Sequence, residues 1–183
     1  MSKVSVGTVI DELNIESIQG QAVQIPSNSN LTHLQFRRFA GCPMCNLHIR
    51  SFIRNHQALV DHGIQEVAVF HSTKSDMLLH HSDAPFPLIA DPDKSLYKKF
   101  GVEASVAALL HPKAWMAGMK GLFVRGAGLP ALGESITGLP ADFLIDASGK
   151  VLAVKYGTHA YDHWELEEVI ELALQNAHSP MKY

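Results

Sequence analysis

The two cysteines of this chain constrain its fold more than any other feature. Cys42 and Cys45 are the only cysteines, and two residues separate them. Before them, residues 31–39 place apolar side chains at nearly alternate positions, which is typical of a strand. After them, residues 43–62 place apolar side chains about every 3.6 residues, which is typical of a helix. A C-x-x-C pair between a strand and a helix predicts a redox-active dithiol in an α/β fold.

The segments on either side of this unit extend the same pattern. Gly63 ends the predicted helix, and residues 64–71 contain the continuous apolar run of a strand that is covered on both faces. The order strand, helix, strand implies parallel pairing with a right-handed crossover. Ahead of this unit, residues 8–26 predict a hairpin that turns at Gly20.

The rest of the chain predicts a mixed central sheet with helices on both faces. Residues 139–146 and 151–156 are expected to pair as antiparallel strands. Residues 104–135 are less regular and are predicted to form an insertion. We find neither an internal repeat nor a linker, so residues 1–183 are predicted to form a single domain. The other predicted elements are a helix at 74–82, a strand at 84–91 and helices at 92–100 and 163–176.

Charge and hydropathy narrow the partners and the compartment. The formal net charge is -3 without a basic stretch, which argues against a nucleic-acid partner. No apolar run approaches the roughly 20 residues of a membrane span. The N-terminus lacks the apolar core and cleavage site of a signal peptide, so we expect a cytoplasmic protein. In that reducing compartment a cysteine pair is more often catalytic or metal-binding than a structural disulfide.

The predicted position of the cysteines favours ionisation. The thiolate is the reactive form of cysteine, and Cys42 is expected at the start of a helix, where free N–H groups and the helix dipole stabilise a negative charge. Pro43 suits the first turn because its missing N–H has no helical partner there. Cys45 follows one turn later on the same side, so a disulfide between the two is sterically natural. We therefore predict Cys42 as the nucleophile and Cys45 as the resolving thiol.

Two arginines directly precede the pair and could add positive potential. Arg37 and Arg38 are consecutive in a predicted strand, so their side chains should point to opposite faces. At most one of them is expected to support the cysteines. Arg38 is predicted to be a group that positions the substrate.

Other interpretations of the pair stay open. Two buried cysteines could simply pack against the sheet. A metal-binding or metallochaperone module would need further ligands, and the histidines lack a recognised spacing such as H-x-x-x-H, so we expect neither a metal nor a cofactor. A redox-sensing interaction protein would use the disulfide to change partner binding through residues 104–135.

A few other polar residues are candidates for acid–base chemistry. Asp162 and Glu165 fit a capping box at the start of the last predicted helix, and they also fit an acid/base pair. His159 and His163 are candidate proton carriers if the fold brings them near the cysteines. His71 ends a predicted parallel strand, where sites gather in open α/β sheets, although a structural role would explain it equally.

A second motif resembles a known superfamily. Residues 138–151, with Pro140 before a strand, resemble the second signature of the thioredoxin superfamily, in which a cis-proline faces the active cysteines. The pattern of residues 13–174 resembles the AhpC/TSA (peroxiredoxin-like) family, and residues 41–45, Gly-Cys-Pro-Met-Cys, match its C-P-x-C subgroup. The resemblance implies a thioredoxin-like fold in which Pro140 is the cis-proline and, like Pro43, helps to position the substrate.

The chain departs from this family where peroxide would bind. Peroxiredoxins carry a Thr or Ser three residues before the peroxidatic cysteine and a Pro seven residues before it, but these positions here are Phe39 and Gln35. The family's arginine would align with Pro140. These departures favour dithiol–disulfide exchange, or slow peroxide reduction, over specialised peroxidase chemistry.

The resemblance also implies an activity and partners. It implies a thiol-dependent antioxidant oxidoreductase that reduces a disulfide or a (hydro)peroxide and is restored by an external dithiol reductant of the thioredoxin or glutathione kind. The cluster Trp115, Met116, Met119 and Phe123 predicts a helix packed on the core or the contact of a homodimer, and alternatively a partner or substrate surface.

Overall fold

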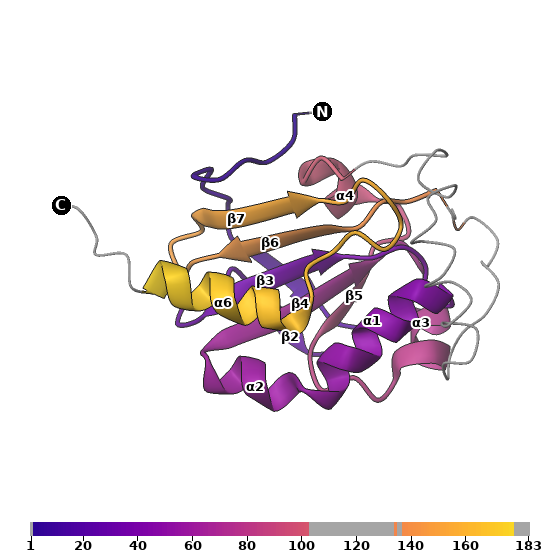
Figure 1. The fold of residues 1–183 in the computed structure, drawn as a ribbon. Helices are drawn as coiled ribbons and strands as arrows, with labels where there is room; N and C mark the ends of the chain where they lie inside the picture. Colours follow the sequence, from indigo (N-terminus) through magenta and orange to yellow (C-terminus); the bar gives the residue numbers. More distant parts are fainter. Residues whose placement is uncertain (1, 103–133, 135–136, 178–183) are drawn as a thin grey trace.

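The computed structural model describes residues 2–102, 134 and 137–177. Within these ranges the chain forms a two-stranded hairpin and a five-stranded sheet with helices around it (Figure 1). The hairpin strands are β1 (Leu13–Glu16) and β2 (Ala22–Ile25), and the sheet strands are β3 (Leu31–Phe36), β4 (Ile64–Phe70), β5 (Leu88–Ala90), β6 (Ala141–Ile145) and β7 (Val151–Tyr156). The helices are α1 (Pro43–Arg54), α2 (His56–Asp61), α3 (Lys74–His81), α4 (Ser95–Lys99) and α6 (Leu166–Ala177).

The five-stranded sheet is mixed, and its strand order is β5-β4-β3-β6-β7. Strands β3, β4 and β5 are parallel, with Leu34 opposite Val67 in the β3–β4 register. Strand β6 is antiparallel to β3, and β7 is antiparallel to β6. The order places β3 at the centre, so the chain leaves the middle of the sheet just before the cysteines.

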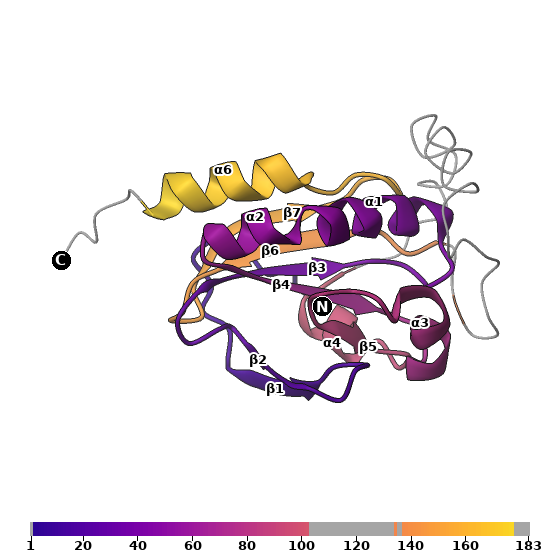
Figure 2. The same ribbon diagram turned by 90° about the horizontal axis from the view of Figure 1, so that it is seen from below.

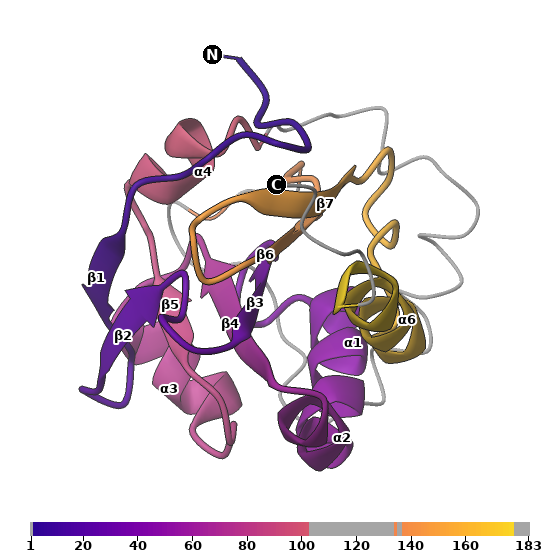
Figure 3. The same cartoon turned by 90° about the vertical axis from the view of Figure 1, so that its left-hand side faces the viewer.

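The sheet separates two layers. Helices α1, α2 and α6 cover one face, whereas α4 and the β1–β2 hairpin lie on the other (Figures 2 and 3). Helix α3 lies beside the edge strand β5. The largest buried side chains toward α1 and α6 include Ile49, Phe52 and Phe70, and those toward α4 include Leu34, Phe36 and Phe143.

Most of the predicted elements are present, and the thioredoxin-like α/β architecture is confirmed. The predicted helix at 43–62 is wrong in one respect, because it breaks at Asn55. That residue has φ -113° and ψ 18°, and its side-chain amide donates to the Ser51 carbonyl at 3.0 Å. Local side-chain bonding of this kind competes with the helical backbone pattern.

The predicted capping box at the last helix is also wrong. Helix α6 begins at Leu166 rather than next to Asp162. The Asp162 carboxylate instead accepts hydrogen bonds from the backbone N–H and hydroxyl of Thr158, both at 2.8 Å. The Glu168 carboxylate accepts from the N–H of Glu165 at 2.8 Å, so an acidic side chain supports the helix start three residues later than expected.

Some predictions fall outside the part of the chain that the structure describes. The insertion at 104–135 and its Trp115–Phe123 cluster lie almost wholly there, so their role stays a prediction. The extent of the single domain over residues 1–183 stays a prediction for the same reason. Among the described helices, none is long and apolar enough to span a membrane.

Candidate active site at the Cys42–Cys45 pair

The cysteines lie at the junction between the central strand β3 and helix α1. Cys42 is the N-cap of α1, and Pro43 occupies the first helical position. The backbone N–H of Cys45 donates to Cys42 Sγ at 3.4 Å, so the sulfur takes the place that a serine oxygen usually has at an N-cap. Both cysteines are free thiols and buried, with 0% and 4% of their surface exposed.

One of the two arginines reaches the pair, as predicted. The Arg38 guanidinium is buried, and its Nη2 donates to Cys42 Sγ at 2.9 Å. The same nitrogen lies 4.0 Å from the Met44 sulfur. A cation in hydrogen-bond contact with a buried sulfur stabilises the thiolate form.

The other arginine points away from Cys42, into the layer beneath α1. Arg37 Nη2 lies 2.7 Å from Asp142 Oδ1 and 2.8 Å from His48 Nε2. Its Nη1 donates to the Phe36 carbonyl at 3.0 Å. Arg37 is therefore fixed by a buried carboxylate, although its charge still helps to lower the pKa of Cys45.

The two thiols ionise as a pair rather than separately. Burial opposes ionisation of Cys45, but a hydrogen bond from Cys42 and the positive charges of Arg38 and Arg37 lower the pKa of Cys45 to about 6. Burial and the interaction with Cys45 raise the pKa of Cys42 well above its ordinary value. The pair thus holds one proton and one negative charge near neutral pH. The negative charge belongs to the coupled pair, so the two thiols ionise together where the sequence predicted ionisation of Cys42 alone, and Arg38 favours the charge on either sulfur.

A buried charge network lies next to Arg37 under the same helix. His33 Nδ1 is 2.7 Å from Glu66 Oε2, and its Nε2 is 3.3 Å from Asp142 Oδ1. The side-chain amide of Gln35 donates to the second Glu66 oxygen. Burial alone lowers the pKa of His33, but Glu66 and Asp142 outweigh it and raise the pKa to about 9. His33 is therefore a buried cation that ties β3 to β4 and β6.

This network was missed in the sequence. The sequence does show polar residues at positions 33, 35 and 66 within otherwise apolar strands, which is the available signal. Nothing in their spacing, however, says that the three side chains meet. Their contact depends on the parallel register that pairs His33 with Glu66 across β3 and β4.

The prediction of a cis-proline at Pro140 is wrong. Among the described residues the cis peptide bond is Ile25–Pro26, so the Leu139–Pro140 bond is trans. The Pro140 carbonyl accepts a hydrogen bond from the N–H of Gly157 at 2.9 Å, just beyond the β6–β7 pairing. The trans bond thereby carries the extended backbone directly into β6. A substrate-positioning role for Pro140 and for Pro43 remains a prediction.

The two departures from peroxiredoxins are accounted for in the core. Gln35 faces Glu66 in the buried network and does not reach the cysteines. Phe39 is 3% exposed and packs in the apolar cluster that also contains both cysteines. An aromatic ring therefore stands close to the place where the family pattern has a hydroxyl group.

The candidate His163 forms a cluster with Glu165 and with His48, which was not predicted. The His48 and His163 rings are tilted by 43° with their centres 3.6 Å apart, and the Nδ1 atom of each lies 3.9 Å from a Glu165 oxygen. Burial lowers the pKa of His163 to about 3 and that of His48 well below its ordinary value. Both are neutral at physiological pH.

The geometry of this cluster does not suit one metal ion, although it joins two imidazoles and a carboxylate. When two imidazoles bind one ion with N–metal distances of about 2.1 Å and an N–metal–N angle of about 109°, their ring centres lie roughly 5 Å apart. The ring centres of His48 and His163 are only 3.6 Å apart, which is too close for that arrangement. His48 Nε2 also accepts a hydrogen bond from Arg37, which leaves the proton on Nδ1, the atom that faces Glu165. A metal at Nδ1 would have to displace that proton and break the bond to Arg37.

The remaining histidines occupy different surroundings. His71 follows β4, and its N–H donates to the Arg38 carbonyl at 3.2 Å. Its ring is buried against Tyr97. His159 Nδ1 accepts from the N–H of Tyr161 at 3.2 Å, so it fixes a turn before α6. Their assignment as proton carriers stays a prediction.

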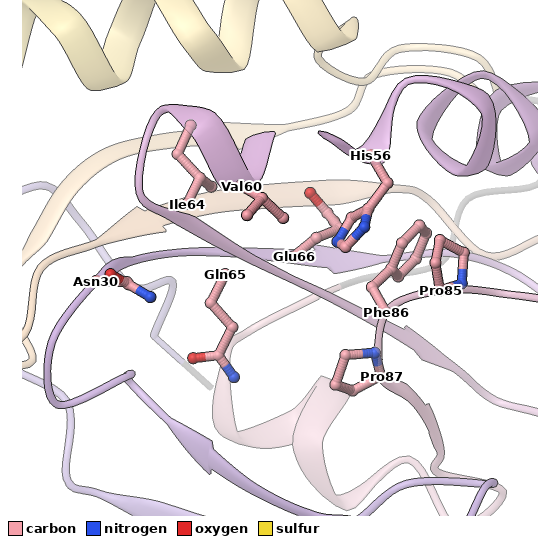
Figure 4. Close-up of a pocket in the computed structure, with 9 residues that line it drawn as sticks. All are labelled: Asn30, His56, Val60, Ile64, Gln65, Glu66, Pro85, Phe86 and Pro87. Carbon is pink, nitrogen blue, oxygen red and sulfur yellow. The ribbon is translucent and has the colours of Figure 1, made fainter. Parts of the chain in front are cut away.

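A cavity of about 210 Å³ lies elsewhere, between α2, the start of β4 and the segment before β5 (Figure 4). His56 and Phe86 stand on one side of it, and Asn30 and Gln65 on the other. Neither cysteine lines this cavity. We therefore do not assign it to the dithiol chemistry.

Comparison with protein families agrees with the fold. A family model described as AhpC/TSA antioxidant enzyme matches residues 50–159, which is more than half of the chain. The chain belongs to this family. The matched range starts after Cys45, so the match rests on the framework and not on the cysteine pair. A search of curated proteins gave no match.

Solved structures show the same fold at low sequence identity. Peroxidoxin BcpB from Mycobacterium tuberculosis aligns with a TM-score of 0.67 at 14% identity, over 93% of this chain and 96% of that chain. A putative thiol:disulfide interchange protein DsbE from Chlorobium tepidum aligns with a TM-score of 0.60 at 18% identity, over 96% and 99%. A Plasmodium vivax 2-Cys peroxiredoxin has a TM-score of 0.67 at 14% identity, over 94% and 82%. At these identities the likeness shows the fold alone.

Proposed function

We propose that this chain is a thiol–disulfide oxidoreductase in which Cys42 and Cys45 deliver two electrons to a disulfide or a (hydro)peroxide. The Arg38 guanidinium, 2.9 Å from Cys42 Sγ, carries the proposal. A guanidinium in hydrogen-bond contact with a buried sulfur stabilises the thiolate, which is the reactive form of cysteine. This contact favours a reactive pair over two cysteines that only pack in the core.

The shared proton gives the pair both a nucleophile and an acid. We assign the attack to Cys42, because it caps α1 and Cys45 lies inside the first turn. Transfer of the Cys42 proton to the Cys45 thiolate leaves a Cys42 thiolate beside Arg38 and a neutral thiol at Cys45. This transfer reconciles the lowered pKa of Cys45 with attack by Cys42.

With a hydroperoxide, the Cys42 thiolate attacks one peroxide oxygen and the O–O bond breaks. The departing alkoxide takes the proton of Cys45, so the products are an alcohol, a Cys42 sulfenic acid and a Cys45 thiolate. The Cys45 thiolate then attacks the Cys42 sulfur and expels hydroxide, which becomes water with a proton from solvent. The result is the Cys42–Cys45 disulfide.

With a disulfide substrate, the Cys42 thiolate attacks one sulfur and forms a mixed disulfide. The departing thiolate takes the proton of Cys45. The Cys45 thiolate then attacks the Cys42 sulfur and releases the second thiolate, which takes a proton from solvent. Both routes oxidise the pair by two electrons. An external dithiol of the thioredoxin or glutathione kind returns it to the reduced form by the reverse exchange.

The surroundings of the pair favour the disulfide route or a slow peroxide reaction. Phe39 and Gln35 replace the peroxiredoxin hydroxyl and proline, and both are engaged in packing or in the buried network. Peroxide would therefore meet a thiolate without the groups that polarise the O–O bond. A dithiol that an external thiol reductant restores fits the cytoplasmic location expected from the sequence, and the proposal keeps that location.

Serine substitutions test the two cysteine roles. After exposure to glutathione disulfide, C45S should accumulate a stoichiometric glutathione adduct on Cys42, because no resolving thiol remains. C42S should form the adduct at least ten times more slowly, and the wild-type chain should form its internal disulfide instead. Mass spectrometry under non-reducing conditions distinguishes the three products.

Two outcomes of this experiment contradict the proposal. An equal rate of adduct formation in C42S and C45S would show that Cys42 is not the preferred nucleophile. Oxidation of the wild-type pair no faster than that of free glutathione, with both glutathione disulfide and hydrogen peroxide, would refute catalysis by this pair. Stopped-flow measurement of both oxidations supplies the second test.

A further inference from the structure

We propose that His81, together with Asn46 and Ser72, is a positioning residue that holds the backbone of Ala40 and thereby sets the geometry of the Cys42–Cys45 pair. The inference rests on the proposed redox function of that pair. It adds three residues that do not touch the reacting sulfurs. They come from the end of α3, the first half of α1 and the turn after β4.

The Ala40 carbonyl receives two side-chain hydrogen bonds. His81 Nε2 donates to it at 3.0 Å, and Asn46 Nδ2 donates at 2.8 Å. A carbonyl only accepts, so the proton of His81 must sit on Nε2. Burial lowers the pKa of His81 to about 4, so the ring is neutral at physiological pH. His81 is fully buried, 41 residues further along the chain.

The amide of Ala40 is held from the other side. Its N–H donates to Ser72 Oγ at 2.8 Å, and the Ser72 hydroxyl donates its own hydrogen to the Glu134 carboxylate. The direction of the hydroxyl is thus fixed, which leaves its oxygen free to accept. Both polar groups of Ala40 are therefore bonded to side chains outside the Phe39–Cys42 turn.

Hydrogen bonds also fix the backbone of Cys42 itself. The Asn46 amide also donates to the Cys42 carbonyl at 3.0 Å, so one side chain bridges the carbonyls of Ala40 and Cys42. The N–H of Cys42 donates to the Phe39 carbonyl at 3.0 Å and closes the turn. With the backbone fixed on both sides, Cys42 Sγ is kept within reach of Arg38 Nη2.

These hydrogen bonds to the backbone of Ala40 and Cys42 favour the reduced form of the cysteine pair. A disulfide needs the sulfurs at about 2.05 Å and a specific torsion, so the turn must adjust when the bond forms. Side chains that fix the dithiol geometry stabilise the reduced form, which makes the pair a stronger oxidant. Loss of the hydrogen bonds to Ala40 should therefore shift the equilibrium with glutathione toward the Cys42–Cys45 disulfide.

A pair of substitutions at His81 separates positioning from simple packing. H81F keeps an aromatic ring of similar size but has no donor, whereas the side-chain amide of H81Q can still donate to Ala40. Because His81 is neutral, neither change removes a charge from the neighbourhood of the cysteines. M77A, in the same buried face of α3, is a control that weakens packing without touching Ala40.

The readouts are the pH titration of thiolate absorbance at 240 nm and the equilibrium with reduced and oxidised glutathione. In H81F we expect a higher titration midpoint and about a tenfold shift of the equilibrium toward the Cys42–Cys45 disulfide, which corresponds to about 30 mV for two electrons. H81Q and M77A should stay close to the wild-type chain in both measurements. S72A should shift both readouts in the same direction as H81F, and it replaces H81F if that variant does not fold.

The outcomes separate this inference from the proposed function. If H81F, or S72A in its place, matches the wild-type chain in both readouts, the positioning role is wrong while the redox function stands. If M77A shifts them as much as H81F, the effect is general loosening and the role is again wrong. If the wild-type pair neither ionises below pH 7 nor exchanges with glutathione, the proposed function and this inference fail together.

Discussion

Replacement of Arg38 by methionine is expected to raise the pH at which the cysteine pair ionises by about two units. The Arg38 guanidinium donates to Cys42 Sγ at 2.9 Å in a buried site. A hydrogen bond to a charged group contributes about 1.5–3 kcal/mol, and one pKa unit corresponds to about 1.4 kcal/mol. Methionine has a similar length and no charge, so it fills the space while the pair stays protonated.

The reaction rate should follow the titration, with one distinction. In R38M the rate with glutathione disulfide should rise with pH to a midpoint about two units higher than in the wild-type chain. The limiting rate at high pH should be equal or greater, because a more basic thiolate is the stronger nucleophile. Thiolate absorbance and stopped-flow rates between pH 5 and 10 measure both effects.

R38K is the matched control for this prediction. Lysine keeps the positive charge but loses the planar fork of donors, so its midpoint should lie between those of R38M and the wild-type chain. A midpoint in R38M that equals the wild-type value would show that Arg38 does not stabilise the thiolate. The principal support for the proposed function would then be lost.

The second large effect is on the free energy of unfolding. His33 and the cysteine pair contribute to it, and their contributions change with pH in opposite directions. His33 has a pKa of about 9 in the folded chain, above its ordinary value of 6.5. Its contribution to the free energy of unfolding is therefore fully present below pH 6.5 and is lost as pH rises through 9. The shift corresponds to about 3 kcal/mol over this window.

The cysteine pair acts in the opposite direction over the same window. The pKa of Cys45 is lowered from 9.0 to about 6, so its contribution is absent at low pH and grows as pH rises from 6 to 9. The two terms should largely cancel in the reduced wild-type chain. The histidines with lowered pKa values, such as His81 and His163, titrate near pH 6.5 in the unfolded chain, so their effect on stability ends by about pH 7.5 and leaves the interval from 7.5 to 9 undisturbed.

Removal of either partner should therefore expose the other. In the double variant C42S/C45S the free energy of unfolding should fall by about 2 kcal/mol between pH 7.5 and 9, because His33 deprotonates in the folded chain over this interval. In H33Q with both cysteines reduced, it should rise over the same interval. Urea unfolding at half-unit steps of pH measures both slopes.

A milder substitution, E66Q, tests the same prediction if H33Q does not fold. In E66Q, His33 keeps Asp142 but loses the Glu66 carboxylate that lies 2.7 Å from its Nδ1. Its pKa should move back toward 6.5, so the fall seen in C42S/C45S should shrink when E66Q is added. An unchanged slope in the triple variant would show that His33 is not the buried cation responsible.

The sequence was sufficient where the relevant physics is local. The N-cap position of Cys42 and the first-turn position of Cys45 depend only on where the helix begins. That only one of Arg37 and Arg38 donates to the cysteines follows from the alternation of side chains along an extended backbone. The parallel pairing of β3 with β4 and the antiparallel pairing of β6 with β7 follow from the connection lengths, and the structure confirms both.

The sequence was insufficient where a result depends on contacts between distant segments. The hydrogen bond from the Gly157 N–H to the Pro140 carbonyl depends on the pairing of β6 with β7. The start of α6 is a different case, because the local pattern offers two acidic residues, Asp162 and Glu168, and does not decide which one supports the helix. His33 was not predicted to matter, because its charge exists only where the register brings a carboxylate from each neighbouring strand.

By itself, then, the sequence determined a dithiol at the start of a helix and the family framework around it. The tertiary structure alone decided how that dithiol is charged and held. A thiol pKa depends on burial and on nearby charges, and both are fixed only when the chain folds. Folding places Arg38 next to Cys42 and leaves one proton shared between Cys42 and Cys45. The hydrogen bonds from His81 and Ser72 to Ala40 likewise form only after α3 and β4 have packed beside the turn.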